Sequence, residues 1–217
     1  MAVNDLVHHG LSYPSSFTHY LPGFHGEDWQ FFIPSQRYLH YKSQSRSWTN
    51  NDECYWRYVT PDEKAVQDIT RTLARGVVGS SWRKKKRDVA NVILEFVHRL
   101  PYQDRNPSYV KYPIETLCEY GGNCVDNSVL AASMLTYAQI PSCFLVYKRH
   151  AAIGVAVPAR GQHVVAEGMK YYAADAVSGS WPRDSIAKVG NKILLGKKGY
   201  AMKNLEQIQL PEKIIVL

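Results

Sequence analysis

The chain has 217 residues, of which 45% are hydrophobic and 21% are charged. This composition is that of a globular protein, and it excludes disordered, collagen-like and disulfide-scaffold classes. The longest uninterrupted apolar stretch, residues 151–159, is far shorter than the ~20 residues of a membrane-spanning helix, so we expect no membrane segment. The 26 lysines and arginines exceed the 19 acidic residues and give a net charge of +7, which favours acidic partners without identifying one.

The first residues lack the basic and then apolar segments of a secretory signal, which predicts a cytoplasmic protein. The four cysteines form no Cys-x-x-Cys pair, and the histidines of the first 58 residues have no metal-ligand spacing. We therefore expect no metal site, no cofactor and no disulfide framework. Cys118 lies six positions before Cys124, so a regulatory disulfide stays open, although a cytoplasmic location favours reduced thiols.

The first 58 residues are rich in aromatic side chains among Pro, Gly, Ser and His, and show neither helical nor strand periodicity. So many aromatic residues argue against a disordered tail. We predict that residues 1–58 form an irregular extension packed against a main domain of residues 59–217. The alternative is that this extension is a substrate-recognition surface.

Helical patterns begin after this extension. Thr-Pro-Asp-Glu at residues 60–63 combines an N-cap, a proline in the first turn and a capping-box glutamate, and Gly76 ends that helix. A second helix ends at Pro101 and has one apolar face, made by Val89, Val92, Ile93, Phe96, Val97 and Leu100. A third helix begins at Cys124 and runs to Ala138. Residues 129–135 are apolar or small nearly all round, which places this helix in the middle of the domain.

The pattern changes to strands after Pro141. We predict strands over residues 143–148, 150–157, 163–167 and 170–176, with a turn at Gly168. Helices followed by an antiparallel sheet are typical of an α+β fold.

Cys124 lies where a thiol can become a nucleophile. Glycines precede it and a helix begins at it, so its sulfur lies beside unpaired backbone N–H groups and the positive helix terminus. This environment favours the thiolate. His150 opens one predicted strand and Asp175 lies near the end of another, so the sheet can bring a base and an orienting carboxylate to the sulfur. A buried structural cysteine is the alternative.

Three other features have competing interpretations. His163 also precedes a strand and lies 12 residues before Asp175, so spacing alone leaves it open as the base. Asp126 is predicted to cap the helix start, because a catalytic carboxylate there would oppose thiolate formation. The Arg-Lys-Lys-Lys-Arg run at residues 83–87 could bind phosphates. It lacks interleaved aromatic residues, so we predict a solvated basic turn and no nucleic-acid binding.

Five stretches, in order, resemble the transglutaminase-like cysteine hydrolases of bacteria and archaea, and the resemblance spans about residues 60–185. They are Phe-Val-His-Arg-Leu-Pro-Tyr at 96–102, Tyr-Pro-Ile-Glu-Thr-Leu at 112–117, Gly-Gly-Asn-Cys-Val-Asp-Asn-Ser at 121–128, His-Ala-Ala-Ile-Gly-Val-Ala-Val at 150–157 and Gly-Met-Lys-Tyr-Tyr-Ala-Ala-Asp at 168–175. The resemblance implies a papain-like transglutaminase-core fold, with Cys124 starting a central helix packed on an antiparallel sheet. It favours His150 over His163. Asn123 and Val125 depart from the acidic residues that the family often has there, and Asp175 departs from its frequent Glu.

The resemblance also implies a chemistry. Cys124 attacks a carbonyl carbon, His150 takes up and returns a proton, and Asp175 holds the imidazole tautomer. Water would resolve the acyl-enzyme thioester as peptide, isopeptide or amide hydrolysis, and an amine would resolve it as transglutaminase transfer. The backbone N–H of Cys124 is the first oxyanion donor, and the second is left among Tyr102, Asn123 and Trp82.

The expected partner is a peptide or protein substrate, and the positive charge would suit an acidic one. A non-catalytic module on the same fold, binding a polyanion or a partner through the basic run and the aromatic extension, is the alternative from another class. The oligomeric state stays open.

Overall fold

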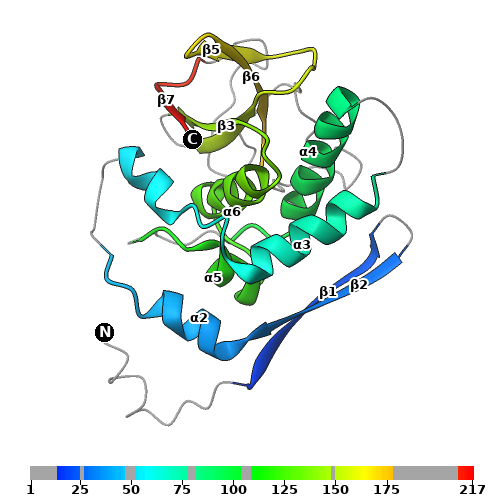
Figure 1. The fold of residues 1–217 in the computed structure, drawn as a ribbon. Coiled ribbons are helices and arrows are strands. Elements are labelled where there is room, and N and C mark those ends of the chain that lie inside the picture. The colour runs from blue at the N-terminus through cyan, green and yellow to red at the C-terminus, as the bar shows by residue number, and fades with distance from the viewer. Residues whose placement is uncertain are drawn as a thin grey trace.

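The computed structural model describes residues 14–24, 27–46, 52–77, 82–103, 109–147, 150–177 and 210–217. A hairpin opens the described chain, followed by helices and then by a sheet (Figure 1). The elements are β1 (Ser16–Phe24), β2 (Glu27–Pro34), α2 (Ser35–Lys42), the 3-10 helix η1 (Asp52–Tyr58), α3 (Lys64–Arg75), α4 (Trp82–His98), α5 (Pro113–Cys118), α6 (Cys124–Tyr137), β3 (Ser142–Tyr147), β4 (His150–Val155), β5 (His163–Ala166), β6 (Met169–Ala174) and β7 (Lys213–Val216).

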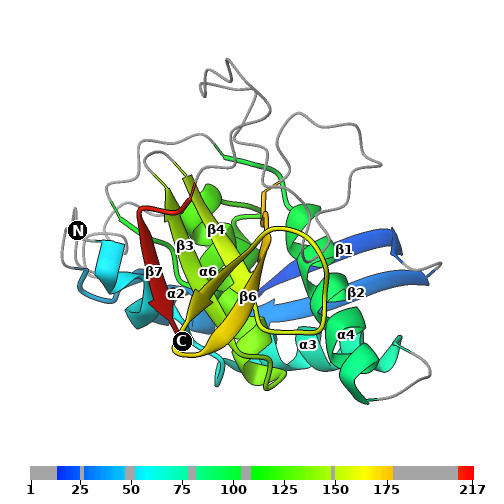
Figure 2. The same cartoon turned by 90° about the horizontal axis from the view of Figure 1, so that it is seen from above.

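Three layers make up the described structure. A curled sheet lies on one side, helices α3 to α6 lie in the middle, and the β1–β2 hairpin lies on the far side of the helices (Figures 1 and 2). The sheet has the order β5-β6-β4-β3-β7, and every neighbouring pair is antiparallel. The α+β class predicted from the sequence is confirmed.

The four predicted strands occur as β3 to β6, with ends shifted by one or two residues. The predicted turn lies at Glu167–Gly168, where both residues have positive φ. The strand β7 was not predicted. It pairs with β3 from the carboxyl end of the chain, and its Lys-Ile-Ile-Val sequence lacks the strict alternation of polar and apolar residues that identifies a half-buried strand.

Alternation along the strands gives the sheet two apolar faces. Side chains on one face join the main core with α6, and they include Phe144, Val146, Ile153, Val155 and Ala174. Those of opposite parity fill the concave side of the curl, and they include Cys143, Leu145, Tyr147, Ala152, Tyr171 and Ala173. Strand β3 is therefore buried along its whole length, which is why its sequence reads as a continuous apolar run.

Gly154 of β4 faces the concave side of the curl. A Cβ atom there would lie 2.6 Å from Cys143 Sγ and 3.0 Å from Tyr171 Cβ. Because the surrounding core is closely packed, we expect Gly154→Ala to lower the free energy of unfolding by about 1–3 kcal/mol. Urea denaturation measures this difference.

Gly76, the C-cap of α3, provides the matched control. Its φ is −67°, and an added Cβ would meet only Leu73 O at 3.6 Å. The unfolding midpoint of Gly76→Ala should stay at the wild-type value or rise slightly, since alanine restricts the unfolded chain. An equal loss of unfolding free energy in Gly154→Ala and Gly76→Ala would contradict the conclusion that close packing around Gly154 excludes a Cβ atom.

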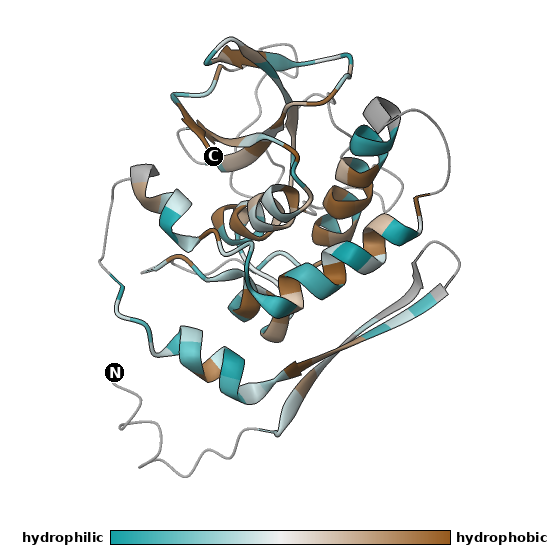
Figure 3. Cartoon of the chain, viewed as in Figure 1, coloured by the Kyte–Doolittle hydropathy of each residue, from teal (hydrophilic) through white to brown (hydrophobic). Residues whose placement is uncertain are grey.

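Helix α6 occupies the centre of the described structure. It packs on α3, α4, α5, β3 and β4, and of residues 124–135 only Val125 is not buried. Hydrophobic residues colour α6 and the inner faces of α3 and α4 in Figure 3, while the outer faces of α3 and α4 are largely hydrophilic. The prediction of a central helix from the apolar run at 129–135 is confirmed.

Two predicted helix starts are wrong. Glu63, not Thr60, is the N-cap of α3, because its carboxylate accepts the Ala65 N–H and pairs with Arg37 of α2. The basic run at residues 83–87 lies within the first turns of α4 and is not a turn. Arginine and lysine have high helix propensity, so these residues extend the helix whose apolar face begins at Val89.

The prediction of an irregular extension is wrong for the described part of residues 1–58. The segment forms the β1–β2 hairpin, α2 and η1, and its Trp29, Ile33 and Tyr58 join the main core. A register shift between Leu21 and Phe24 interrupts the hairpin's alternation, which hid the strand period in the sequence. The boundary between residues 58 and 59 stays a prediction.

Within the described residues, no helix has the length and hydropathy that crossing a bilayer requires.

Candidate active site

Cys124 is the first residue of α6, and a capping box holds the start of this helix. The side chain of Asn123 accepts hydrogen bonds from the backbone N–H groups of Val125 and Asp126 at 2.9 and 3.0 Å. The carboxylate of Asp126 in turn accepts the Asn123 N–H at 3.0 Å. The predicted capping role of Asp126 is confirmed. Cys124 is 9% exposed and packs against Ala151 and Val177.

The sheet brings His150 and Asp175 together. Ala174 pairs with Ile153 across β6 and β4, so Asp175, the next residue, lies near the start of β4, where His150 is the first residue. His150 Nε2 lies 3.1 Å from Asp175 Oδ1, and the imidazole is also hydrogen-bonded to Cys124. Because Nε2 faces the carboxylate, Nδ1 is the nitrogen that remains for the sulfur. The three residues that the sequence singled out therefore form one hydrogen-bonded chain.

Charge outweighs burial at His150, which is 8% exposed. Burial alone would lower the pKa of its imidazole. The negative charge of Asp175 and its hydrogen bond, followed by the hydrogen bond and charge of Cys124, instead raise this pKa to about 10. His150 therefore carries a proton at neutral pH and can stabilise a neighbouring thiolate.

Two further groups close to Asp175 remain neutral. Burial raises the pKa of Tyr147 to about 12, and the charge of Asp175 adds to this. Burial lowers the pKa of His98 against the opposing charges of Asp175 and Glu95. His150 is thus the cation that faces Asp175. The sequence pattern indicated no role for either residue, although pairing of the predicted strands 143–148 and 150–157 would have placed Tyr147 opposite His150.

The candidates for a second oxyanion donor differ in position. Tyr102 packs against the cluster that contains Cys124, and it forms an isolated bridge with Gly122. The Oδ1 atom of Asn123 caps α6, so only its NH2 group could donate. Trp82 begins α4 close to Lys85, which lies beside Tyr137 at the opposite end of α6. The side chain of Trp82 lies outside the described part of the structure, so its role as a donor stays a prediction.

His163 is not beside the sulfur. It is exposed on β5, an edge strand of the sheet, where its Nδ1 contacts Gly161 O and its ring packs on Tyr172. Cys54, Cys118, Cys124 and Cys143 are all free thiols.

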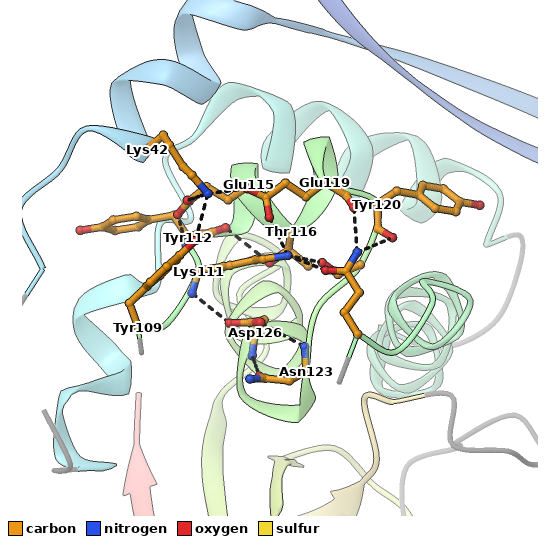
Figure 4. A network of polar contacts seen from close by, with 12 residues as sticks. Lys42, Tyr109, Lys111, Tyr112, Glu115, Thr116, Glu119, Tyr120, Asn123 and Asp126 are labelled. Carbon is orange, nitrogen blue, oxygen red and sulfur yellow. Dashed lines mark hydrogen bonds and ion pairs between the residues drawn. The ribbon is translucent and has the colours of Figure 1, made fainter. Parts of the chain in front are cut away.

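A buried ionic network supports the turn before Cys124 (Figure 4). Lys111 is 0% exposed, and its Nζ donates to Gly121 O and Gln103 Oε1 and pairs with Glu119 Oε2, each at 2.8 Å. Its backbone N–H donates to Asp126 at 2.9 Å. Lys111 therefore links the turn at Gly121 to the cap of α6.

The network continues into α2 and the residues that follow it. Lys42 pairs with Glu119 at 2.7 Å, and Arg46 pairs with the buried Glu115 at 2.7 Å. Burial would raise the pKa of Glu119, but the hydrogen bonds and charges of Lys111 and Lys42 lower it to about 2. This network could not be predicted from residue patterns, since its members are distant along the chain and meet only in the fold.

Comparison with known proteins adds one structural likeness. No protein-family model and no curated protein matches the sequence. Among solved structures, a candidate cysteine protease from Cytophaga hutchinsonii aligns with 62% of this chain at 16% identity, with a TM-score of 0.40. The aligned region spans 43% of that protein, less than half of its length.

Proposed function

We propose that the protein is a cysteine-dependent hydrolase of peptide, isopeptide or amide bonds. The observation that carries the proposal is the hydrogen-bonded chain from Cys124 through His150 to Asp175 at the start of a buried helix. A nucleophile at the start of a central helix, with base and acid on neighbouring strands, also supports a papain-like transglutaminase-core fold. The sequence resemblance supports the same fold.

In the proposed reaction, the Cys124 thiolate attacks the substrate carbonyl carbon to form a tetrahedral oxyanion. The backbone N–H of Cys124 donates to this oxyanion, with Tyr102 or the NH2 group of Asn123 as the second donor. The His150 imidazolium gives its proton to the leaving amine as the C–N bond breaks, which leaves a thioester and a neutral imidazole. His150 then takes a proton from water as the water attacks the thioester, and the tetrahedral intermediate breaks down to the acid product and the thiolate, paired again with the imidazolium.

The same acyl-enzyme could transfer its acyl group to an amine. His150 would then take a proton from the attacking amine, and the product would be a new amide. Hydrolase and transferase therefore share every residue of the site, and they differ only in the nucleophile that reaches the thioester.

We expect iodoacetamide at about pH 6.5 to label Cys124 in preference to the other three cysteines, because among the described residues Cys124 is the one cysteine with an imidazolium partner. Burial raises the pKa of both Cys118 and Cys143 to about 12. Mass spectrometry of the digested protein locates and quantifies the label. Preferential labelling of Cys54 or Cys143 would argue against an activated nucleophile.

Turnover is tested with a panel of amide, peptide and isopeptide substrates, with and without an added amine. We expect Cys124→Ala to lose more than about 10³-fold of any activity found, because the proposed thioester forms on the Cys124 sulfur. Cys54→Ala is the matched control and should retain activity. An amine adduct would identify a transferase. Activity that survives in Cys124→Ala would refute the assigned nucleophile, and salt-sensitive retention on a polyanion without turnover would favour a binding module.

A further inference from the structure

A cleft lies at the end of α6 opposite to Cys124. It has a volume of about 380 Å³ and is formed by α3, α4, the last residue of α6 and the segment that leads into β3. This volume is within the range of small-molecule sites. Ala74, Val89, Ala138 and Ile140 provide an apolar wall.

The cleft is separate from the candidate active site. Cys124 is the first residue of α6 and Tyr137, which lines the cleft, is the last. At 1.5 Å per residue, the 14-residue helix separates the two places by about 20 Å. A molecule in this cleft would therefore not touch the sulfur, and the inference does not depend on the proposed function.

Three cationic side chains line the cleft. Arg71 is held by Tyr137, whose hydroxyl accepts from its guanidinium at 2.8 Å and whose ring centroid lies 5.9 Å away. Lys86 Nζ donates to the Gln139 carbonyl at 2.7 Å. Lys85 is exposed, and no acidic side chain of the described residues pairs with it.

The acidic partner of Arg71 is shared with a second cation. Asp68 binds Arg71 at 2.9 Å and Lys64 at 2.8 Å. The cleft thus combines an apolar wall with cations on α3 and α4. Apolar surface gains free energy by leaving water, and a carboxylate or phosphate gains charge-assisted hydrogen bonds from lysine and arginine.

We propose that this cleft binds a small amphipathic anion, with an apolar body against the alanine, valine and isoleucine wall and one carboxylate or phosphate head at Arg71, Lys85 and Lys86. A neutral analogue would lose the charge pairing. A cationic analogue would be repelled by the three side chains. A short anion without an apolar body would lose the burial that distinguishes this site from other basic surface.

The test uses the full chain carrying Cys124→Ala, so that the proposed chemistry at the active site cannot influence it. Decanoate and decyl phosphate are titrated in separate arms while backbone amide NMR shifts are followed, and the two arms distinguish a carboxylate from a phosphate ligand. We expect saturable shifts at Ala74, Val89 and Ala138 with either probe. Decanol, decyltrimethylammonium and acetate should bind at least about tenfold more weakly. Equal binding of decanol or of the cation, or shifts confined to residues around position 124, would overturn the proposal.

Two variants test the head and the body of the ligand separately. Lys85→Glu should weaken binding of the preferred anion about tenfold, whereas Lys170→Glu, which makes the same charge change at an exposed position of β6, should bind it as the parent protein does. Ala74→Trp fills the cleft without changing charge and should abolish binding, with an unfolding midpoint near that of the parent. Undiminished binding in both Lys85→Glu and Ala74→Trp would refute the site.

Discussion

Asp175→Ala is expected to slow alkylation of Cys124 at pH 7 by about tenfold or more, and to reduce any turnover by about 10³ to 10⁴-fold. Without the carboxylate, burial dominates at His150 and lowers the pKa of its imidazole. The neutral ring would no longer stabilise a thiolate, and it would lose the hydrogen bond that fixes its tautomer. Alkylation rates measured across pH test this expectation without knowledge of the substrate.

The shape of the pH profile distinguishes electrostatic activation from simple accessibility. Wild-type alkylation should be faster than that of Asp175→Ala from about pH 6 to 9, because His150 keeps its proton up to about pH 10 and its imidazolium can stabilise the reacting sulfur. In Asp175→Ala the rate should rise only as an ordinary thiol ionises, near pH 8.5. Asp175→Asn keeps an acceptor for Nε2–H without the charge and should lie between the two. Asp88→Ala, which removes a carboxylate that pairs with Arg87, serves as control. A wild-type profile in Asp175→Ala would contradict the ion-pair assignment.

The same ion pair contributes to folding stability with a defined sign. The folded pKa of His150 lies above its ordinary value of 6.5, so the contribution is complete below about pH 6.5 and is lost as the pH rises towards 10. The difference in unfolding free energy between wild type and Asp175→Ala should therefore shrink as the pH rises through this window.

Lys111→Met is expected to lower the free energy of unfolding by about 3–5 kcal/mol, the usual cost of removing one partner from a buried ion pair. Methionine fills a similar volume, but it leaves Gly121 O and the carboxylate of Glu119 without the ammonium group. The matched control is Lys64→Met. Lys64 is exposed and pairs with Asp68 within one helix, so its loss should cost less than about 0.5 kcal/mol. Urea unfolding at pH 7 compares the two variants, and equal costs would refute the network's role.

Unfolding measured at acid pH tests the contribution of Glu119 separately. Its pKa of about 2 lies below the ordinary value of 4.5, so its contribution is present above about pH 4.5 and is lost as the pH falls towards 2. Removing Lys111 takes away one of the two cations that lower this pKa. The acid transition of Lys111→Met should therefore begin at a higher pH than that of Lys64→Met.

The sheet and the central helix could be predicted because their signals are local. Strands β3 to β6 alternate around a glycine turn, and the run at residues 129–135 is apolar on all sides of a helix. The hairpin β1–β2 could not be predicted in this way, since the aromatic residues Tyr20 and Phe32 are exposed whereas the aromatic Trp29 is buried. Aromatic side chains on both faces of a hairpin conceal which face is inside.

The three central residues of the candidate site could be named from the sequence, whereas the buried residues around them could not. Glycines before a helix pointed to Cys124, and the strand pattern pointed to His150 and Asp175, which the structure brings together. The neutral state of Tyr147 and His98 depends on burial in the assembled fold, and residue spacing carries no information about burial. The burial of Lys111 could not be predicted either. It is one lysine among many in the sequence, and the fold makes it a fully buried cation.

The salt bridges that reach back from α5 to α2 have a consequence for any shortened form of the protein. A chain that started at residue 59 would lack both Lys42 and Arg46, and the buried carboxylate of Glu115 would keep only the Tyr112 N–H among its described contacts. An unpaired charge in the interior lowers the folding stability. The short helix α5, which contains Glu115 and precedes Cys124, would be the element that is destabilised. The amino-terminal segment is therefore a structural component of the part of the molecule that contains Cys124, and the two should be expressed together.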